Sequence, residues 1–237
     1  MLLICPVRPG DSNDELRYAL RSWETNLILP DGLDLMTVGY KPSWLNPDIH
    51  VEGNRYTSMP LAVFDNVLLG AQEAIRQEAD TAVYMNDDFF CLDPVGAILP
   101  VKRNCTLAKQ IAKFPQNAGL WWPKSLRLTA SWLESEGFPH PDSYEAHRPL
   151  ICKPDGMIEA LSRWNSTCRD WTTDTVPQWR TAYGVLNKVE AYPIVDAKLS
   201  TSTTGYGTPW VSTSDQSWRR YGRAIAQRFQ KPSRWER

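Results

Sequence analysis

The first part of the chain alternates between short apolar runs and longer amphipathic segments. Four runs have the length and composition of β-strands: Leu2–Val7, Asp34–Tyr40, Ile49–Gly53 and Thr81–Met85. Strands that alternate with helices are typical of α/β proteins, in which the helices cover both faces of a mostly parallel sheet. We therefore expect an α/β fold with such a sheet.

Two segments between these strands carry apolar residues at helical spacing. The first lies in SNDELRYALRSW, where Ser12 is followed three residues later by Glu15, the pattern of a capping box at a helix start. The second follows Ser58 and Pro60, a common start signal, and its apolar positions continue to Ile75. Both segments are predicted to be helices that pack on the sheet.

The second half of the chain has a weaker pattern. It predicts helices within Gly119–Gly137, at Lys153–Trp164 and at Ser214–Phe229, a late strand at Val189–Leu199 and a loop at Thr201–Pro209. No internal repeat or linker divides the chain. We therefore expect residues 1–237 to form a single domain.

The strand at Thr81–Met85 ends on polar residues, namely Asn86, Asp87 and Asp88. Ligands of parallel sheets bind outside the carboxyl ends of the strands, so these side chains are expected to face a cleft rather than to be buried. Adjacent carboxylates suit Mg²⁺ or Mn²⁺, which take further ligands from a substrate's phosphates. The other interpretation is that the two aspartates cap a turn.

Composition indicates a globular protein, because apolar residues make up 42% and charged residues 22% of the sequence. The five cysteines are scattered, which favours buried free thiols in a reducing cytoplasm and no zinc site. The start lacks the basic leader of a signal peptide, and no run approaches the ~20 apolar residues of a membrane span. We expect a cytoplasmic protein with no membrane partner.

Several motifs occur in the order found in a known family. The segments DELRYALRSWETNL, PSWLN, IHVEG, PLAVFDN and YMNDDFF, from Asp14 to about Asp93, resemble the second conserved region of the Stealth family of sugar-phosphate transferases. Short phage glycosyltransferases are similar too, and closer in length. The resemblance implies a GT-A-like, Rossmann-like fold, a nucleotide-sugar donor such as a UDP-sugar, and Mn²⁺ or Mg²⁺. Residues 1–100 would then bind the donor and residues 101–237 the acceptor.

The resemblance also implies roles for individual residues. Asp87 and Asp88 match the acidic motif that holds the metal, with Asp88 also catalytic and Asn86 at the donor. His147, near Pro149 and ahead of a helix, matches a histidine expected to contact the donor's phosphates or sugar. Without the resemblance, His147 would be interpreted as an ordinary surface or core imidazole.

Three further positions follow from the same resemblance. Arg169 matches an arginine after the histidine, with Arg180 as its substitute, although both could be surface arginines. Asp215 matches the acidic residue of a short last region, and the alternative that it only caps the final helix is favoured.

The first conserved region departs from the family's Val-Asn-Gly-x-Asp-like turn. Here the turn is CPVRPGD, so that Arg8, Gly10 and Asp11 stand near the expected position of the donor's uridine. This difference leaves open whether the protein transfers a sugar or a sugar phosphate.

The expected activity is metal-dependent transfer of a sugar, or a sugar phosphate, from a nucleotide sugar to a hydroxyl acceptor. One alternative is a hexose-1-phosphate transferase that acts on a glycan or a protein. Another is a non-catalytic carbohydrate- or nucleic-acid-binding module on the same fold. A metal nuclease would need a catalytic Lys or His near the acidic pair, and Lys102 is not convincingly placed for this.

The C-terminal segment suggests an acceptor. Residues 218–237 contain seven basic residues and one acidic residue, a net charge of +6, which leaves −1 − 6 = −7 for residues 1–217. Basic residues among aromatic ones suit a polyanion with stackable bases, so the acceptor is predicted to be DNA with a hydroxymethylated base. Otherwise this is a solvated amphipathic helix whose aromatic residues pack on the core. The residues concerned are Arg219, Arg220, Arg223 and Arg228, with Trp218, Tyr221, Phe229 and Trp235.

Overall fold

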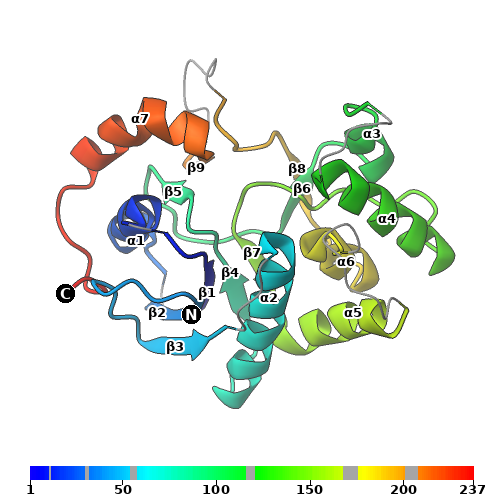
Figure 1. The fold of residues 1–237 in the computed structure, drawn as a ribbon, viewed down its shortest axis with the longest axis horizontal. Helices are drawn as coiled ribbons and strands as arrows, with labels where there is room; N and C mark the ends of the chain where they lie inside the picture. The colour runs from blue at the N-terminus through cyan, green and yellow to red at the C-terminus, as the bar shows by residue number, and fades with distance from the viewer. Residues whose placement is uncertain (11, 30–31, 54–57, 116–120, 168–175, 201–207) are drawn as a thin grey trace.

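A computed structural model describes residues 1–10, 12–29, 32–53, 58–115, 121–167, 176–200 and 208–237. Its centre is a five-stranded sheet with the strand order β3-β2-β1-β4-β7 (Figure 1). The first four of these strands in the chain are parallel, and β7 runs antiparallel to β4. The expectation of a mostly parallel α/β sheet is confirmed. The strands are β1 (Leu2–Val7), β2 (Asp34–Gly39), β3 (Ile49–Glu52), β4 (Ala82–Tyr84) and β7 (Leu150–Cys152).

Helices cover both faces of this sheet, because the alternating side chains of each strand feed two separate cores. Leu2 and Ile4 of β1 belong to the core beneath α2 (Met59–Arg76) and α5 (Pro154–Thr167). Leu3 and Cys5 belong to the core beneath α1 (Asp14–Asn26) and α7 (Asp215–Arg228). Figure 1 shows the two helix pairs on opposite sides of the sheet.

Helix α2 lies especially close to the sheet. A Cβ atom at Gly70 would stand 2.7 Å from Ile4 Cγ2, so only glycine permits this approach. The Tyr84 hydroxyl of β4 donates a hydrogen bond to the carbonyl of Val67, at 2.5 Å. These contacts hold the middle of α2 against β1 and β4.

Short elements outside the main sheet complete the fold. β5 (Phe89–Cys91) pairs antiparallel with β9 (Trp210–Ser212), and β6 (Val101–Arg103) pairs parallel with β8 (Tyr192–Ile194). The predicted late strand at Val189–Leu199 is therefore wrong in its extent, because only three of its residues form β8, outside the main sheet. The remaining helices are α3 (Leu107–Ile111), α4 (Trp121–Ser135) and α6 (Trp179–Leu186). Most of the predicted loop at Thr201–Pro209 lies outside the described residues.

Two predicted helix caps are wrong. At α1 the cap position is Asn13, in the left-handed conformation with φ 50° and without a side-chain cap hydrogen bond, so Ser12 and Glu15 form no capping box. At α7 Ser214 is the cap, and its side chain accepts a hydrogen bond from the Ser217 backbone. Asp215 is therefore the first helical residue rather than the cap, and its carboxylate is left for other contacts.

The aromatic residues of the C-terminal segment pack inward, as the alternative interpretation proposed. Phe229 and Trp235 are buried, with 4% and 1% of their surface exposed. The ring of Trp218 stacks on Phe90, with centroids 5.7 Å apart and planes 5° from parallel. These rings are not available to stack on bases, because they fix α7 and the chain end to the core.

The cysteines and the helices of the described part of the chain test two expectations from composition. Cys5, Cys91 and Cys152 are buried free thiols and Cys105 is a partly buried one, whereas Cys168 lies outside the described residues. Among the residues that the structure describes, no helix combines the length and apolar character needed to cross a bilayer.

We predict that Gly39→Ala lowers the free energy of unfolding by about 2–4 kcal/mol. Gly39 has a φ of 104°, and a Cβ there would lie 2.5 Å from Asn66 Nδ2 and 2.8 Å from the Val7 carbonyl. Urea denaturation measures the loss. Gly96→Ala is the matched control, because its Cβ meets nothing within 4 Å, and it should change stability by less than ~0.5 kcal/mol. Equal losses in the two variants would contradict this interpretation.

Candidate active site

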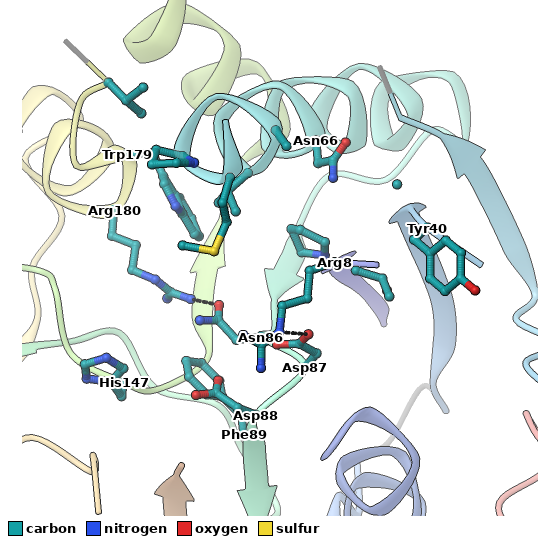
Figure 2. Close-up of a pocket in the computed structure, with 18 of the residues that line it drawn as sticks. Arg8, Tyr40, Asn66, Asn86, Asp87, Asp88, Phe89, His147, Trp179 and Arg180 are labelled. Carbon is teal, nitrogen blue, oxygen red and sulfur yellow. Dashed lines mark hydrogen bonds and ion pairs between the residues drawn. The ribbon is translucent and has the colours of Figure 1, made fainter. Parts of the chain in front are cut away.

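A cleft of about 1280 Å³ opens at the carboxyl ends of β1 to β4. Its lining includes Arg8 after β1, Tyr40 after β2 and Asn86 after β4, and the opposite wall carries Trp179 and His147. Figure 2 shows these side chains around one central space. The location agrees with the expectation that strand ends deliver the polar residues to a cleft.

Asp87 lies in the cleft with 16% of its side chain exposed, 3.4 Å from Arg8 Nε. Burial and the charge of Asp88 raise its pKa to about 7, although Arg8 acts in the opposite direction. Burial next to a second carboxylate therefore makes the ionised form of Asp87 unfavourable in spite of Arg8. Such a position favours an additional cation.

Asp88 also lines the cleft but is more deeply buried than expected, with only 9% of its surface exposed. Its Oδ2 atom accepts hydrogen bonds from Lys198 Nζ at 2.7 Å and from Ser212 Oγ at 2.8 Å. Its Oδ1 atom is buried and has no hydrogen-bond partner among the described residues. The burial follows from the sequence, because Phe89 begins strand β5 and enters the core immediately after Asp88.

Arg8 links three carboxylates at one edge of the cleft. Besides Asp87, its Nη2 atom contacts Glu15 Oε2 at 2.9 Å and Asp215 Oδ1 at 3.3 Å. Glu15 is buried enough that desolvation raises its pKa, although a hydrogen bond from Thr213 opposes this. The structure thus brings Arg8 and Asp215 to the acidic pair.

Of the other two residues of the first turn, only Gly10 can be placed, and it is not brought into the described site. Gly10 is absent from the described lining of the cleft, and its nearest contacts are to the Asn13 side chain. Asp11 lies outside the described residues.

Arg180 fixes the amide of Asn86. Its Nη2 atom donates to Asn86 Oδ1 at 2.6 Å, and its Nη1 atom donates to the Arg148 carbonyl at 2.9 Å. Burial lowers the pKa of Arg180 to about 10, while the nearby charge of Glu145 opposes this. Arg180, which was predicted as the alternative to Arg169, therefore lies at the acidic motif. Arg169 itself is outside the described residues.

His147 is held by Asp196. The histidine Nδ1 atom lies 2.9 Å from Asp196 Oδ1, and its backbone nitrogen donates to the same oxygen at 2.9 Å. Arg103 Nη1 contacts the other oxygen of Asp196 at 2.7 Å. Burial would raise the pKa of Asp196, but hydrogen bonds from His147 and the charge of Arg103 outweigh it and hold that pKa below its usual value. The carboxylate orients the ring through Nδ1, and Nε2 has no hydrogen-bond partner in the part of the chain that the structure describes.

Several site residues had no recognisable signal in the sequence. Lys198 and Asp196 lie in a segment without a motif, about 110 residues after Asp88. Glu15 occurs in the helix that resembles the family, but its role was assigned to capping. Lys102, considered for a nuclease, instead pairs with Asp142 at 2.5 Å and does not line the described cleft.

The two aspartates alone are too few to bind a divalent cation, which would need further oxygen ligands from a bound substrate. In the described part of the chain, no three His, Cys, Asp or Glu side chains form a group that could hold a metal ion. Asp87 and Asp88 nevertheless provide hard oxygen ligands, and Asp88 Oδ1 is a buried acceptor that receives no hydrogen bond from the described residues. Mg²⁺ is commonly bound by one or two carboxylates together with substrate phosphates and water. The donor set therefore fits a metal–phosphate complex better than a free ion.

Comparison with known proteins agrees in part with the resemblance to sugar-phosphate transferases. No family model matches the chain. Over 147 residues, 59% of this chain, it is 29% identical to an exopolysaccharide phosphotransferase of Streptomyces coelicolor. The match covers 21% of that protein, so this chain spans about a fifth of the length of its curated relative.

Two solved structures are similar at a low level. PaToxG glycosyltransferase has a TM-score of 0.36 and 7% identity, with 79% of this chain and 68% of that chain covered. Mouse xyloside xylosyltransferase 1 has a TM-score of 0.40 and 12% identity, with 99% and 95% covered.

We predict that Arg180→Met lowers the free energy of unfolding by about 3–5 kcal/mol, because it removes the buried positive charge near Glu145 and leaves that buried carboxylate with only its described hydrogen bonds, from Thr181. In the background of Glu145→Gln the same replacement should cost at least ~1 kcal/mol less. A double-mutant cycle followed by chemical denaturation measures this coupling. Additive effects of the two substitutions would show that Glu145 and Arg180 do not interact.

Proposed function

We propose that this protein is a metal-dependent transferase that moves a sugar, or a sugar phosphate, from a nucleotide sugar to a hydroxyl acceptor on a GT-A-like fold. The observation that carries this proposal is the acidic pair at the end of β4, in which Asp87 is largely buried beside Asp88 and Asp88 Oδ1 has no hydrogen-bond partner among the described residues. A cleft of about 1280 Å³ has room for a nucleotide sugar and part of an acceptor. The similarity to an exopolysaccharide phosphotransferase supports the same chemistry.

In this proposal Asp87 and Asp88 hold Mn²⁺ or Mg²⁺ together with the donor's diphosphate. When bound, the ion neutralises charge that develops on the leaving phosphate. Arg8 lies 3.4 Å from Asp87 and is close enough to the acidic pair to bind a phosphate oxygen beside it. Arg180 keeps the Asn86 amide in one orientation, so that its nitrogen can donate to the donor.

His147 is proposed to act on the acceptor. Because Nδ1 faces the Asp196 carboxylate, the neutral ring carries its proton there and leaves the Nε2 lone pair free. That nitrogen can take the proton of the attacking hydroxyl, while Asp196 stabilises the resulting imidazolium. Asp215 stays beside Arg8 and is proposed to limit the positions of this arginine.

A glycan hydroxyl is the acceptor that the cleft suits best. Trp121 and Trp122 line it with ring centroids 5.5 Å apart, and an apolar ring face next to polar groups suits a sugar. DNA with a hydroxymethylated base is a second candidate, because α7 begins at the cleft and carries exposed Arg219 and Arg223 along its surface. The donor is expected to be a UDP-sugar.

The decisive experiment is incubation with a panel of nucleotide sugars and Mn²⁺, with identification of the nucleotide released. Release of the nucleoside diphosphate indicates sugar transfer, and release of the monophosphate indicates sugar-phosphate transfer. Binding of nucleotide without turnover in any combination would favour the non-catalytic alternative.

Replacement of Asp87 or Asp88 by Asn should lower turnover at least ~100-fold, because each variant removes a charge that faces the diphosphate. Asp93→Asn is the matched control. Its carboxylate is 61% exposed and pairs with Arg228 rather than facing the cleft. Full turnover by both cleft variants would disprove the assignment of the acidic pair.

Charge reversal of Arg219 and Arg223 separates the two acceptors. If the acceptor is a glycan, the double variant should transfer at the wild-type rate, because both residues lie on the exposed face of α7. If DNA is the acceptor, the variant should lose transfer to the polymer and the salt dependence of binding should become shallower. Transfer assays with each acceptor at two salt concentrations measure the difference.

A further inference from the structure

Lys198 forms an ion pair with Asp88, one of the two proposed metal ligands. It follows β8 along the chain, and its side chain, 30% exposed, reaches from the cleft wall to Asp88. The Nζ atom donates to Asp88 Oδ2 at 2.7 Å and also to the carbonyl of Thr213. Ser212 Oγ lies 3.2 Å from the same Nζ atom and donates to the same carboxylate oxygen.

These contacts place the ammonium group of Lys198 on Asp88, a carboxylate that is a proposed metal ligand. Asp88 Oδ2 is fully occupied by Lys198 and Ser212, whereas Oδ1 has no partner in the described structure. An ammonium group and a divalent cation on one carboxylate repel each other strongly in a sheltered site. The lysine therefore weakens metal binding for as long as it stays on Asp88.

The backbone around Lys198 is fixed, so that only its side chain can respond. Leu199 N donates to the Ser212 carbonyl at 2.8 Å, and Ser212 N donates to the Ala197 carbonyl at 3.0 Å. Ala197 and Leu199 are buried on either side. The four-carbon stem of lysine can carry its charge a few ångströms without moving these anchors.

We propose that Lys198 is an exchangeable counter-ion of Asp88, which holds the carboxylate in the metal-free protein and moves to the donor's diphosphate when the metal binds. This inference rests on the proposed function and adds a residue to it. The protein would then keep its acidic pair ordered without a metal and bind the metal well only when a diphosphate is present to receive the ammonium group. A purely structural ion pair would show neither property.

The test is Mn²⁺ affinity in the absence of nucleotide, measured from the electron paramagnetic resonance signal of free Mn²⁺. Lys198→Met removes the charge but keeps most of the length of the side chain, and it should bind Mn²⁺ about fivefold more tightly than the wild type. Lys198→Arg keeps the charge and should stay near the wild type. Lys41→Met is the matched control, because Lys41 lines the same cleft without contacting Asp88, and its effect should be less than about twofold.

Catalysis should change in the opposite direction. Because Lys198→Met has no ammonium group for the diphosphate, its kcat should fall by at least about tenfold at saturating Mn²⁺, although the metal binds more tightly. Unchanged or weaker Mn²⁺ binding by Lys198→Met would overturn the proposal.

If Lys198→Met does not fold, the wild-type protein supplies the same test. Acetylation of Lys198, followed by mass spectrometry, should increase when Mn²⁺ is added without nucleotide, whereas acetylation of Lys41 should stay constant. No increase at Lys198 at saturating Mn²⁺ would overturn the exchange. If neither the wild type nor any variant binds Mn²⁺, with or without UDP, the metal-dependent function itself fails. Equal Mn²⁺ affinities of the wild type and Lys198→Met would disprove only the role of Lys198.

Discussion

The buried carboxylate of Asp88 is the contact on which the site depends. Its side chain binds Lys198 and Ser212, and its backbone carbonyl accepts from Thr213 N at 3.2 Å. These partners come from the last third of the chain, whereas Asp88 follows β4, at the end of the N-terminal strand–helix segment. One residue therefore joins the sheet to the segment that leads into α7. The same carboxylate is a proposed metal ligand. The atoms of Asp88 that hold these segments together are therefore also those proposed to act in the chemistry.

Charge balance explains why cations from distant elements gather at this end of the sheet. Glu15, Asp87 and Asp88 would repel one another in a sheltered cleft, and Arg8 and Lys198 each contact members of the group. Burial and the charge of Asp88 nevertheless keep the pKa of Asp87 raised, to about 7, and Arg8 and Lys198 do not offset them. A second polar layer, in which Arg180 holds Asn86 and Asp196 holds His147, fixes two side chains that face the same space. Figure 2 shows both around the acidic pair.

Local sequence patterns predicted the part of the fold that local interactions specify. Strands β1 to β4 and helix α2 have apolar runs or helical spacing long enough to be recognised, and the acidic motif follows β4 directly. Strand β4 also has only three residues, but it lies within the longer apolar run Thr81–Met85, whereas the bounds of β5 to β9, of three residues each, depend on pairing across the fold. Lys198 and Asp196 could not be found for the same reason, since each acts on a residue about 50–110 positions away. The prediction of a capping box failed at Glu15, whose carboxylate contacts Arg8 and accepts a hydrogen bond from Thr213, a partner 198 positions away.

The central claim is that Asp87 and Asp88 bind a metal together with the donor's diphosphate. A crystal structure with Mn²⁺ and UDP, with anomalous scattering to locate the ion, tests it most directly. We predict one Mn²⁺ peak about 2.1 Å from an oxygen of at least one of the two carboxylates and at a similar distance from the diphosphate oxygens. A diphosphate bound without a metal, or a metal located away from both aspartates, would contradict it.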